Sequence, residues 1–212
     1  MQHSALLNVM IAAARKAART LKRDFGEVEN LQVSLKGPGN FVTAADRKAE
    51  ETLKAELAKA RPGYGFLGEE SGRHAGTDTT HTWIVDPLDG TTNFLHGIPQ
   101  FAISIGLERS GTIVAGVIYN PITDELFVAE RGKGAFLNDQ RLRVAGRRKL
   151  NESVVACGLP HYGRGDLDLA QAEMQAITES ARRFRAATRS RLSLRKAPLP
   201  RSATKSSSVI GL

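Results

Sequence analysis

The stretch Trp83–Phe94 (Trp-Ile-Val-Asp-Pro-Leu-Asp-Gly-Thr-Thr-Asn-Phe) constrains the fold of this chain more than any other segment. It begins with bulky and β-branched side chains, which favour a buried strand. Pro87 fixes its own φ angle and favours extended geometry at Asp86, so the strand ends in a tight turn flanked by Asp86 and Asp89. Gly90 allows close approach of the backbone to a bound group. The polar residues after it are typical of a helix N-terminus.

This turn has two interpretations, and a second acidic segment favours one of them. A turn followed by a capped helix uses the same residue types as a site for a metal ion and a phosphate group. However, Gly65–Ser71 predicts a short strand ending in Glu69 and Glu70, just upstream of the strand that carries Asp86 and Asp89. Like charges about 4 Å apart repel by on the order of 4 kcal/mol at an effective dielectric near 20. Four acids at neighbouring strand ends therefore predict divalent cations, with Mg²⁺, Ca²⁺ or Mn²⁺ favoured over zinc.

The composition excludes a membrane-spanning protein and a disulfide-stabilised one. Hydrophobic residues make up 41% and charged residues 25% of the chain, as in ordinary globular proteins, and there is no apolar run of about 18 residues or more. The single Cys157 cannot form an internal disulfide, and Met1–Arg23 lacks the features of a secretory signal. We therefore expect a cytoplasmic location and no contact with a membrane.

The formal net charge of +8 arises in one terminal segment. Ser180–Leu212 contains 9 of the 30 basic residues and none of the 22 acidic residues, so the remainder of the chain is close to neutral. Its part Arg189–Ser208 is rich in Ser, Arg and Pro, which predicts a disordered tail. The positive net charge is therefore a property of this tail and does not indicate a basic surface on the folded part of the chain.

The order of expected elements is typical of an α+β fold. A helix is expected at Ala5–Phe25, capped by Ser4, and another at Thr43–Ala60, where Thr43 and Asp46 fit a capping box. Gly72–Thr82 is interpreted as a surface loop. Besides Tyr64–Leu67, strands are expected at Leu31–Leu35, Phe101–Leu107, Thr112–Tyr119, Glu125–Glu130, Ala135–Leu137 and Arg141–Val144.

The pattern changes near residue 151, which predicts a domain boundary. Residues 1–150 are expected to form an α+β domain that carries the metal site. Residues 151–187 would begin an α/β domain, with a strand at Val154–Gly158 and a helix from Asp166 to about Ala181. Residues 188–212 are the basic tail.

The segment Gly68-Glu69-Glu70 and the stretch Trp83–Phe94 together resemble the signature pair of the inositol monophosphatase family, whose members are Mg²⁺-dependent and Li⁺-sensitive phosphatases. The resemblance runs from about Ala5 to about Arg185. It implies a layered α-β-α-β-α sugar-phosphatase fold in which the N-terminal α+β half is largely complete and the C-terminal α/β half is truncated. It also implies hydrolysis of a phosphate monoester, with a small phosphorylated polyol such as inositol monophosphate as substrate.

The resemblance assigns roles to the acidic residues and their neighbours. One Mg²⁺ would be held by Glu69, Asp86 and the Leu88 carbonyl, and a second by Asp86 and Asp89. The family binds two or three ions. The resemblance further implies that Glu70, Thr91 and Asp46 orient and deprotonate the attacking water. The substrate would be bound by Glu69, Leu88, Asp89, Gly90 and Thr91, with the N–H groups of the last two around the phosphate. Lys36, in the loop Lys36–Asn40, would be the family's mobile lysine.

The family's third signature, a Trp-Asp-x-Ala-Ala-Gly element, has no counterpart in this chain. We therefore expect the reading frame or the recorded sequence to depart from the family near Ala186. Related phosphatases for fructose 1,6-bisphosphate or a phosphoadenosine nucleotide are alternatives. So is a non-catalytic protein that binds RNA or a transcription complex. A homodimer is expected from the family. Ser-His-Asp catalysis is disfavoured, because there is no Gly-x-Ser-x-Gly motif.

Overall fold

The structure, a computed structural model, describes residues 3–27, 33–35, 41–146, 148–149, 152, 154–157, 166–180 and 183–186. The chain divides into two compact units. The first comprises Met1–Ser34 and Phe41–Leu142, and the second comprises Leu35–Asn40 and Arg143–Leu212. The predicted boundary near residue 151 stays a prediction.

An eight-stranded sheet forms the centre of the first unit. Its strands lie in the order β10-β9-β8-β7-β6-β5-β3-β4, and every neighbouring pair is antiparallel except β3 and β5, which are parallel. The strands are β3 (Tyr64–Gly68), β4 (Gly72–His74), β5 (Asp78–Asp89), β6 (Ala102–Arg109), β7 (Thr112–Asn120), β8 (Glu125–Glu130), β9 (Gly134–Leu137) and β10 (Gln140–Leu142). The single parallel pair has a consequence for the site, because its two strands end at the same edge.

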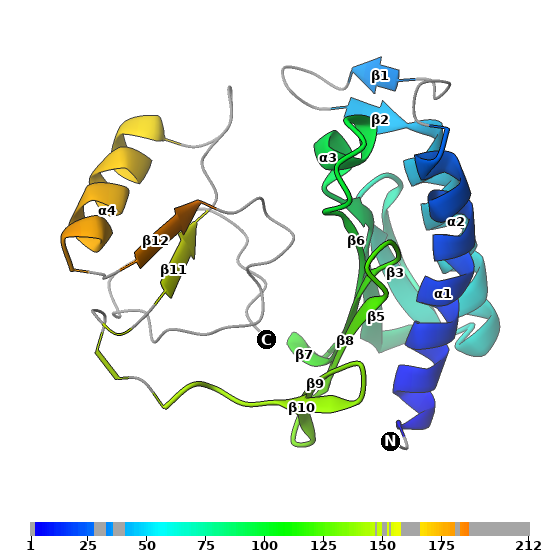
Figure 1. Ribbon diagram of the computed structural model, residues 1–212. Coiled ribbons are helices and arrows are strands. Elements are labelled where there is room, and N and C mark those ends of the chain that lie inside the picture. Colours follow the sequence, from blue (N-terminus) through cyan, green and yellow to red (C-terminus); the bar gives the residue numbers. More distant parts are fainter. Residues whose placement is uncertain are drawn as a thin grey trace. The chain divides into compact units, whose positions relative to one another are not determined.

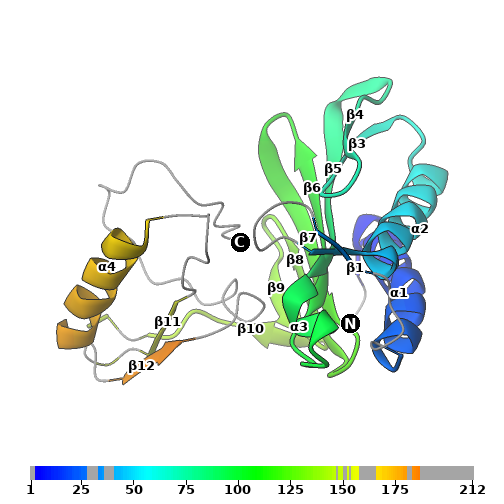
Figure 2. The same ribbon diagram turned by 90° about the horizontal axis from the view of Figure 1, so that it is seen from above.

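Two long helices pack side by side on one face of this sheet (Figures 1 and 2). Helix α1 (Ala5–Phe25) contacts β6 and β7, and helix α2 (Ala44–Ala60) contacts β3 and β5. Both helices have buried apolar residues at helical spacing. In α1 these are Leu7, Met10, Ile11, Ala13, Ala14, Ala17, Ala18 and Leu21, and in α2 they are Ala45, Ala49, Leu53 and Leu57.

The sheet contributes the other half of this core through alternating side chains. In β6, Ile103, Ile105 and Leu107 are buried, whereas Ser104 and Gly106 between them are only partly buried. Such alternation is expected of a strand with one face against helices. The β6–β7 hairpin turns at Ser110 and Gly111, which both have positive φ angles. This is the geometry that two-residue hairpins prefer.

The described residues also form two two-stranded sheets and two further helices. Strands β1 (Val33–Leu35) and β2 (Phe41–Thr43) form a two-stranded sheet, and the short helix α3 (Thr91–Leu95) contacts β2. In the second unit, β11 (Val154–Cys157) pairs in parallel with β12 (Arg183–Ala186), and helix α4 (Leu167–Ser180) contacts β12. Parallel pairing across an intervening helix is the βαβ arrangement.

Most of the predicted elements are confirmed, with one clear error. Helix α1 has the predicted bounds, and the Leu7 N–H donates to the Ser4 hydroxyl at 3.2 Å as a helix cap. The prediction of a loop at Gly72–Thr82 is wrong. Residues Gly72–His74 form β4, and β5 begins at Asp78. The prediction failed because the polar composition of this segment is typical of a loop. The strands are stabilised instead by backbone pairing with β3 and by stacking of Tyr64 on His81.

Some predictions fall on residues that the structure does not describe. Lys36 and its loop, the side chain of Thr43 in the capping box, and the tail 188–212 lie outside the described residues. Among the helices that the structure describes, none combines the length and the apolar character needed to span a bilayer.

A candidate metal and phosphate site

The parallel pairing of β3 and β5 brings two acidic segments to one edge of the sheet. Gly68, the last residue of β3, is paired with Val85 of β5, and the Glu69 N–H donates to the Val85 carbonyl at 3.1 Å. Glu69 and Asp86, which are the residues that follow this pair, therefore lie next to each other. The register shows that the two acidic segments lie on neighbouring strands, as the order of the motifs predicted, and the gathering of the four acids into one site stays a prediction.

The end of β5 is a turn held by its own side chains. The Leu88 N–H donates to the Asp86 carboxylate at 3.1 Å, and the Thr91 hydroxyl donates to the Leu88 carbonyl at 3.0 Å. Pairing with β6 shifts register between Asp86 and Asp89. A register shift re-aims side chains at the end of a strand. The turn thus presents two carboxylates within four residues.

Gly90 ends this turn and begins α3. Its φ angle of 98° lies in the left-handed region, and a Cβ there would lie 2.9 Å from the Gln100 carbonyl oxygen. Only glycine satisfies both conditions without strain. The helix that follows is anchored, because Phe94 is buried against Phe25 and Phe101 and the Asn93 amide donates to Gln100 at 2.6 Å.

The acidic residues influence one another strongly. Burial, the charges of Glu69 and Asp89, a side-chain hydrogen bond with Glu69 and the charge of Asp46 together raise the pKa of the Asp86 carboxyl to about 9. A carboxyl is raised this far when it is buried among other carboxylates. The surroundings of Asp86 therefore disfavour its ionised form unless a cation neutralises the group.

Asp46 reaches this cluster from α2. Its exposed fraction is only 1%, and it lies on the buried side of the helix next to Ala45. Its charge acts on Asp86, as noted above, so three segments of the chain contribute acids to one place. His96, by contrast, ends α3 as an exposed residue.

Two further residues of α2 contact the acidic loop, and the sequence analysis missed both. Glu50, with an exposed fraction of 3%, accepts the Glu70 N–H at 2.8 Å and the Ser71 N–H at 2.9 Å. Arg47 lies 3.8 Å from the Glu70 carboxylate, which is itself nearly buried. The signal for Glu50 was present, since it follows Asp46 by four residues and lies between the buried residues Ala49 and Leu53. An acid in the apolar stripe of a helix indicates a specific partner.

The donor set fits a hard divalent cation by its chemistry. Carboxylate and carbonyl oxygens from Glu69, Asp86, Asp89 and Leu88 are the ligands that Mg²⁺ and Mn²⁺ prefer. The raised pKa of Asp86 shows that negative charge is crowded there. Within the described ranges, no three His, Cys, Asp or Glu side chains converge closely enough to enclose an ion.

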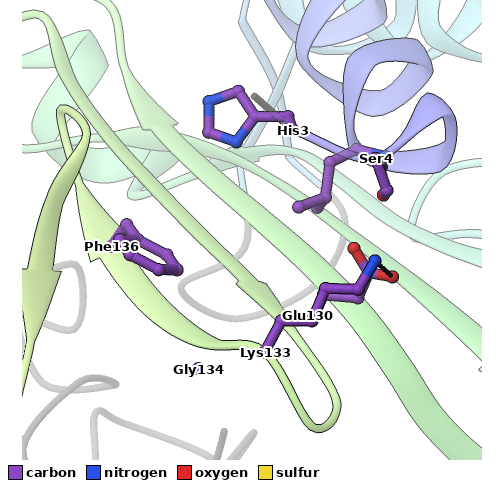
Figure 3. A pocket seen from close by; sticks show the side chains of 7 residues that line it. His3, Ser4, Glu130, Lys133, Gly134 and Phe136 are labelled. Carbon is purple, nitrogen blue, oxygen red and sulfur yellow. Dashed lines mark hydrogen bonds and ion pairs between the residues drawn. The ribbon is translucent and has the colours of Figure 1, made fainter. Parts of the chain in front are cut away.

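A small cavity lies elsewhere in the first unit. It has a volume of about 50 Å³ and is situated between the start of α1, at His3 and Ser4, and the β8–β9 hairpin, at Glu130 and Phe136 (Figure 3). None of the acidic site residues lines it. A space of this size holds a water molecule or two rather than a sugar phosphate.

Comparison with known proteins gives a consistent result. The model of the inositol monophosphatase family matches residues 2–195. An inositol-1-monophosphatase from Mesorhizobium japonicum is 71% identical over 165 residues, which cover 78% of this chain and 62% of the relative. A Nus factor SuhB from Pasteurella multocida is 38% identical over 180 residues, which cover 85% of this chain and 67% of the relative.

The fold agrees with the sequence match. The crystal structure of the extragenic suppressor protein suhB from Bartonella henselae is 57% identical and superimposes with a TM-score of 0.83. The match covers 87% of this chain and 71% of that structure. The chain belongs to the inositol monophosphatase family. The predicted layered α+β phosphatase fold is confirmed, and the chain spans about 62% of the length of the Mesorhizobium relative.

Proposed function

We propose that this chain hydrolyses phosphate monoesters with the help of Mg²⁺, and that inositol monophosphate is its substrate class. The observation that carries the proposal is the gathering of acids from three segments around Asp86, whose pKa is raised to about 9. The family match and the Mesorhizobium relative's name support the same reaction. Because the chain spans 62% of that relative, the activity is proposed here for this chain on its own residues.

The acidic residues and one backbone carbonyl would hold two metal ions. Glu69, Asp86 and the Leu88 carbonyl would hold one Mg²⁺, and Asp86 with Asp89 would hold a second. Such ions stabilise the attacking and leaving oxygens of a phosphoryl transfer and lower the pKa of water. Without them, side chains alone could not supply the large acceleration that phosphate monoesters require.

The remaining polar groups would position the water and the phosphate. The Thr91 hydroxyl donates to the Leu88 carbonyl. Together with the carboxylates of Glu70 and Asp46, it would orient the attacking water. These carboxylates would accept a proton from the attacking water. The N–H groups of Gly90 and Thr91 would donate to phosphate oxygens, as free N–H groups at the start of a helix can.

A phosphate-release assay tests the proposal. The purified chain is incubated with inositol monophosphate, with and without Mg²⁺, and compared with the variants Asp89→Asn and Asp168→Asn. The second variant removes the same charge at an exposed position of α4. We expect Mg²⁺-dependent release by the wild type and by Asp168→Asn, and a loss of about 100-fold or more in Asp89→Asn. Absence of Mg²⁺-dependent release from a folded wild-type chain would overturn the proposal.

The substrate class is tested by a panel of monoesters in the same assay. Fructose 1,6-bisphosphate and a phosphoadenosine nucleotide represent the two alternative branches. The proposal requires the highest kcat/KM with inositol monophosphate. A preference for either alternative would keep the reaction and change the substrate.

A second candidate function is binding to RNA or to a transcription complex. Two observations favour it: the Pasteurella relative is named a Nus factor, and Ser180–Leu212 contains nine basic and no acidic residues. Salt-dependent RNA binding that is lost on deletion of Ser180–Leu212 would support it. We also propose that the chain forms a homodimer and is located in the cytoplasm, as expected from the sequence. Sedimentation of the purified chain tests whether it is a dimer.

A further inference from the structure

In the loop that carries Glu69 and Glu70, all three backbone N–H groups make hydrogen bonds. It joins β3 to β4, where Gly68 pairs with Gly72, so three residues form the turn. The Glu69 N–H donates to Val85, and the Glu70 and Ser71 N–H groups both donate to Glu50. One side chain of α2 therefore binds two of the three donors in this loop.

The contact between Glu50 and the loop is close and buried. Glu50 has an exposed fraction of 3%, and each of its carboxylate oxygens accepts one N–H group, at 2.8 and 2.9 Å. A Cβ at Gly68 would lie only 2.5 Å from the Glu50 Cδ atom. The glycine thus leaves the room that the carboxylate occupies. Because a buried carboxylate is costly unless its lone pairs are satisfied, this geometry fixes both the side chain and the loop.

The same helix face connects Glu50 to the acid cluster. Asp46 precedes Glu50 by four residues, one helical turn, and both side chains are buried. Arg47 approaches the Glu70 carboxylate from the same turn of the helix. Helix α2 therefore sets the position of Asp46 and of the Glu69–Glu70 loop together.

We infer that Glu50 is a positioning residue for the metal-binding acids. Its carboxylate binds the Glu70 and Ser71 N–H groups, which holds Glu69 beside Asp86 and the Glu70 carboxylate near Arg47. The inference rests on the proposed function, because it concerns how those acids are placed for a cation. Residues that orient a ligand without touching the ion commonly change metal affinity by 10- to 100-fold.

The test compares Glu50→Gln with Glu51→Gln. Both variants lose one negative charge from α2, but Glu51 is exposed to solvent. Glutamine at position 50 offers one acceptor oxygen and an NH₂ group, so one loop N–H loses its acceptor. Mn²⁺ affinity is measured from the EPR signal of free Mn²⁺, and hydrogen exchange is measured at the Glu70 and Ser71 amides.

The inference predicts a joint effect on the loop and on the ion. In Glu50→Gln, Mn²⁺ affinity falls by about 10-fold or more and the two amides exchange faster, whereas Glu51→Gln matches the wild type in both. If Glu50→Gln does not fold, Glu50→Asp replaces it. Its carboxylate keeps the charge but is one methylene shorter, so it loses at least one N–H contact, and the same changes are expected.

The outcomes separate this inference from the proposed function. If the wild type and a folded Glu50→Gln bind Mn²⁺ equally, the positioning role is overturned while the proposed function stands. Equal weakening in Glu50→Gln and Glu51→Gln would also overturn it, because charge alone would then explain the effect. If the wild type takes up no Mn²⁺, the proposed function fails, and the inference fails with it.

Discussion

The middle and the last part of β5 differ in what they contribute to the molecule. In the middle part, Trp83 pairs with Phe66 on one side and Leu107 on the other, and Val85 is buried two residues later. In the last part, between Asp86 and Asp89, the pairing with β6 shifts register. The strand thus belongs to the core at Trp83 and Val85 and becomes an irregular acidic turn after Val85.

This difference separates stability from function along a single strand. The apolar part contributes free energy of folding through burial, at roughly 25 cal/mol per Å² of apolar surface. The acidic part opposes folding, because burial and neighbouring charges make ionisation of Asp86 unfavourable, as its raised pKa shows. Sites that bind cations commonly have such an unfavourable charge arrangement, which the ion relieves.

The largest effect on stability is expected in the apolar part. The side chain of Trp83 has an exposed fraction of 1% and packs 5.5 Å from the Tyr64 ring, measured between centroids. Trp83→Ala should lower the free energy of unfolding by about 3–5 kcal/mol through loss of burial and creation of a cavity. Urea denaturation followed by circular dichroism measures this loss.

Trp83→Phe is the matched control for that prediction. Among the described residues, the buried Trp83 indole N–H has no hydrogen-bond acceptor, so removing it sacrifices no hydrogen bond. The loss should therefore be clearly smaller than for alanine. Equal losses in the two variants would mean that the core around Trp83 does not stabilise the strand as described.

The acidic part is expected to make stability depend on pH in an unusual direction. In the folded state the pKa of Asp86 is raised from 3.8 to about 9, so the folded chain holds a proton that the unfolded chain has released. This contribution is fully present below about pH 4 and is lost as the pH rises towards 9. Without divalent cations, the free energy of unfolding should therefore fall as the pH rises through this window.

Asp86→Asn tests the origin of that slope. Asparagine can donate to Glu69 as the protonated acid does, but it does not titrate. The variant should lose the slope between pH 5 and 8 and be more stable than the wild type at pH 8. Asp78, whose pKa is lowered to about 2 chiefly by hydrogen bonds from Thr80, affects stability only below this window. An unchanged slope in Asp86→Asn would contradict the assignment.

A smaller effect is expected where the turn ends. Gly90→Ala combines a left-handed backbone with a Cβ that would lie 2.9 Å from the Gln100 carbonyl, and should lower stability by about 1–3 kcal/mol. Gly97 also has a positive φ angle, but a Cβ there meets nothing within 4 Å. Gly97→Ala should therefore cost only the backbone strain. Thermal denaturation compares the two, and equal losses would exclude a specific close approach at Gly90.

The sequence predicted the apolar part and the acids of β5, but not what holds them. Hydrophobic periodicity identified α1, and the order of motifs identified the acidic strand ends, because both signals are local. The first residues of β5 were missed, since Thr80, His81 and their neighbours are polar and their pairing with β3 and β6 is made by the backbone. Pairing with strands that are distant in the sequence cannot be predicted from the local composition.

Glu50 was missed for a different reason. Its partners are the backbone N–H groups of Glu70 and Ser71, about 20 residues later in the chain. Because almost every residue has a backbone N–H group, the sequence does not indicate which of them binds a side chain. The roles of Glu69, Asp86, Asp89 and Thr91 towards an ion stay predictions. The geometry of these residues supports the roles, and measurements of ion binding are needed to test them.

Calorimetric titration of the purified chain with Mg²⁺ tests the central claim most directly. Because Asp86 holds a proton near neutral pH, Mg²⁺ should bind with release of about one proton, and its affinity should increase as the pH rises from 6 to 9. Buffers of different ionisation enthalpy reveal the proton. A folded chain that binds no Mg²⁺ at millimolar concentration, even with excess phosphate, would contradict the account.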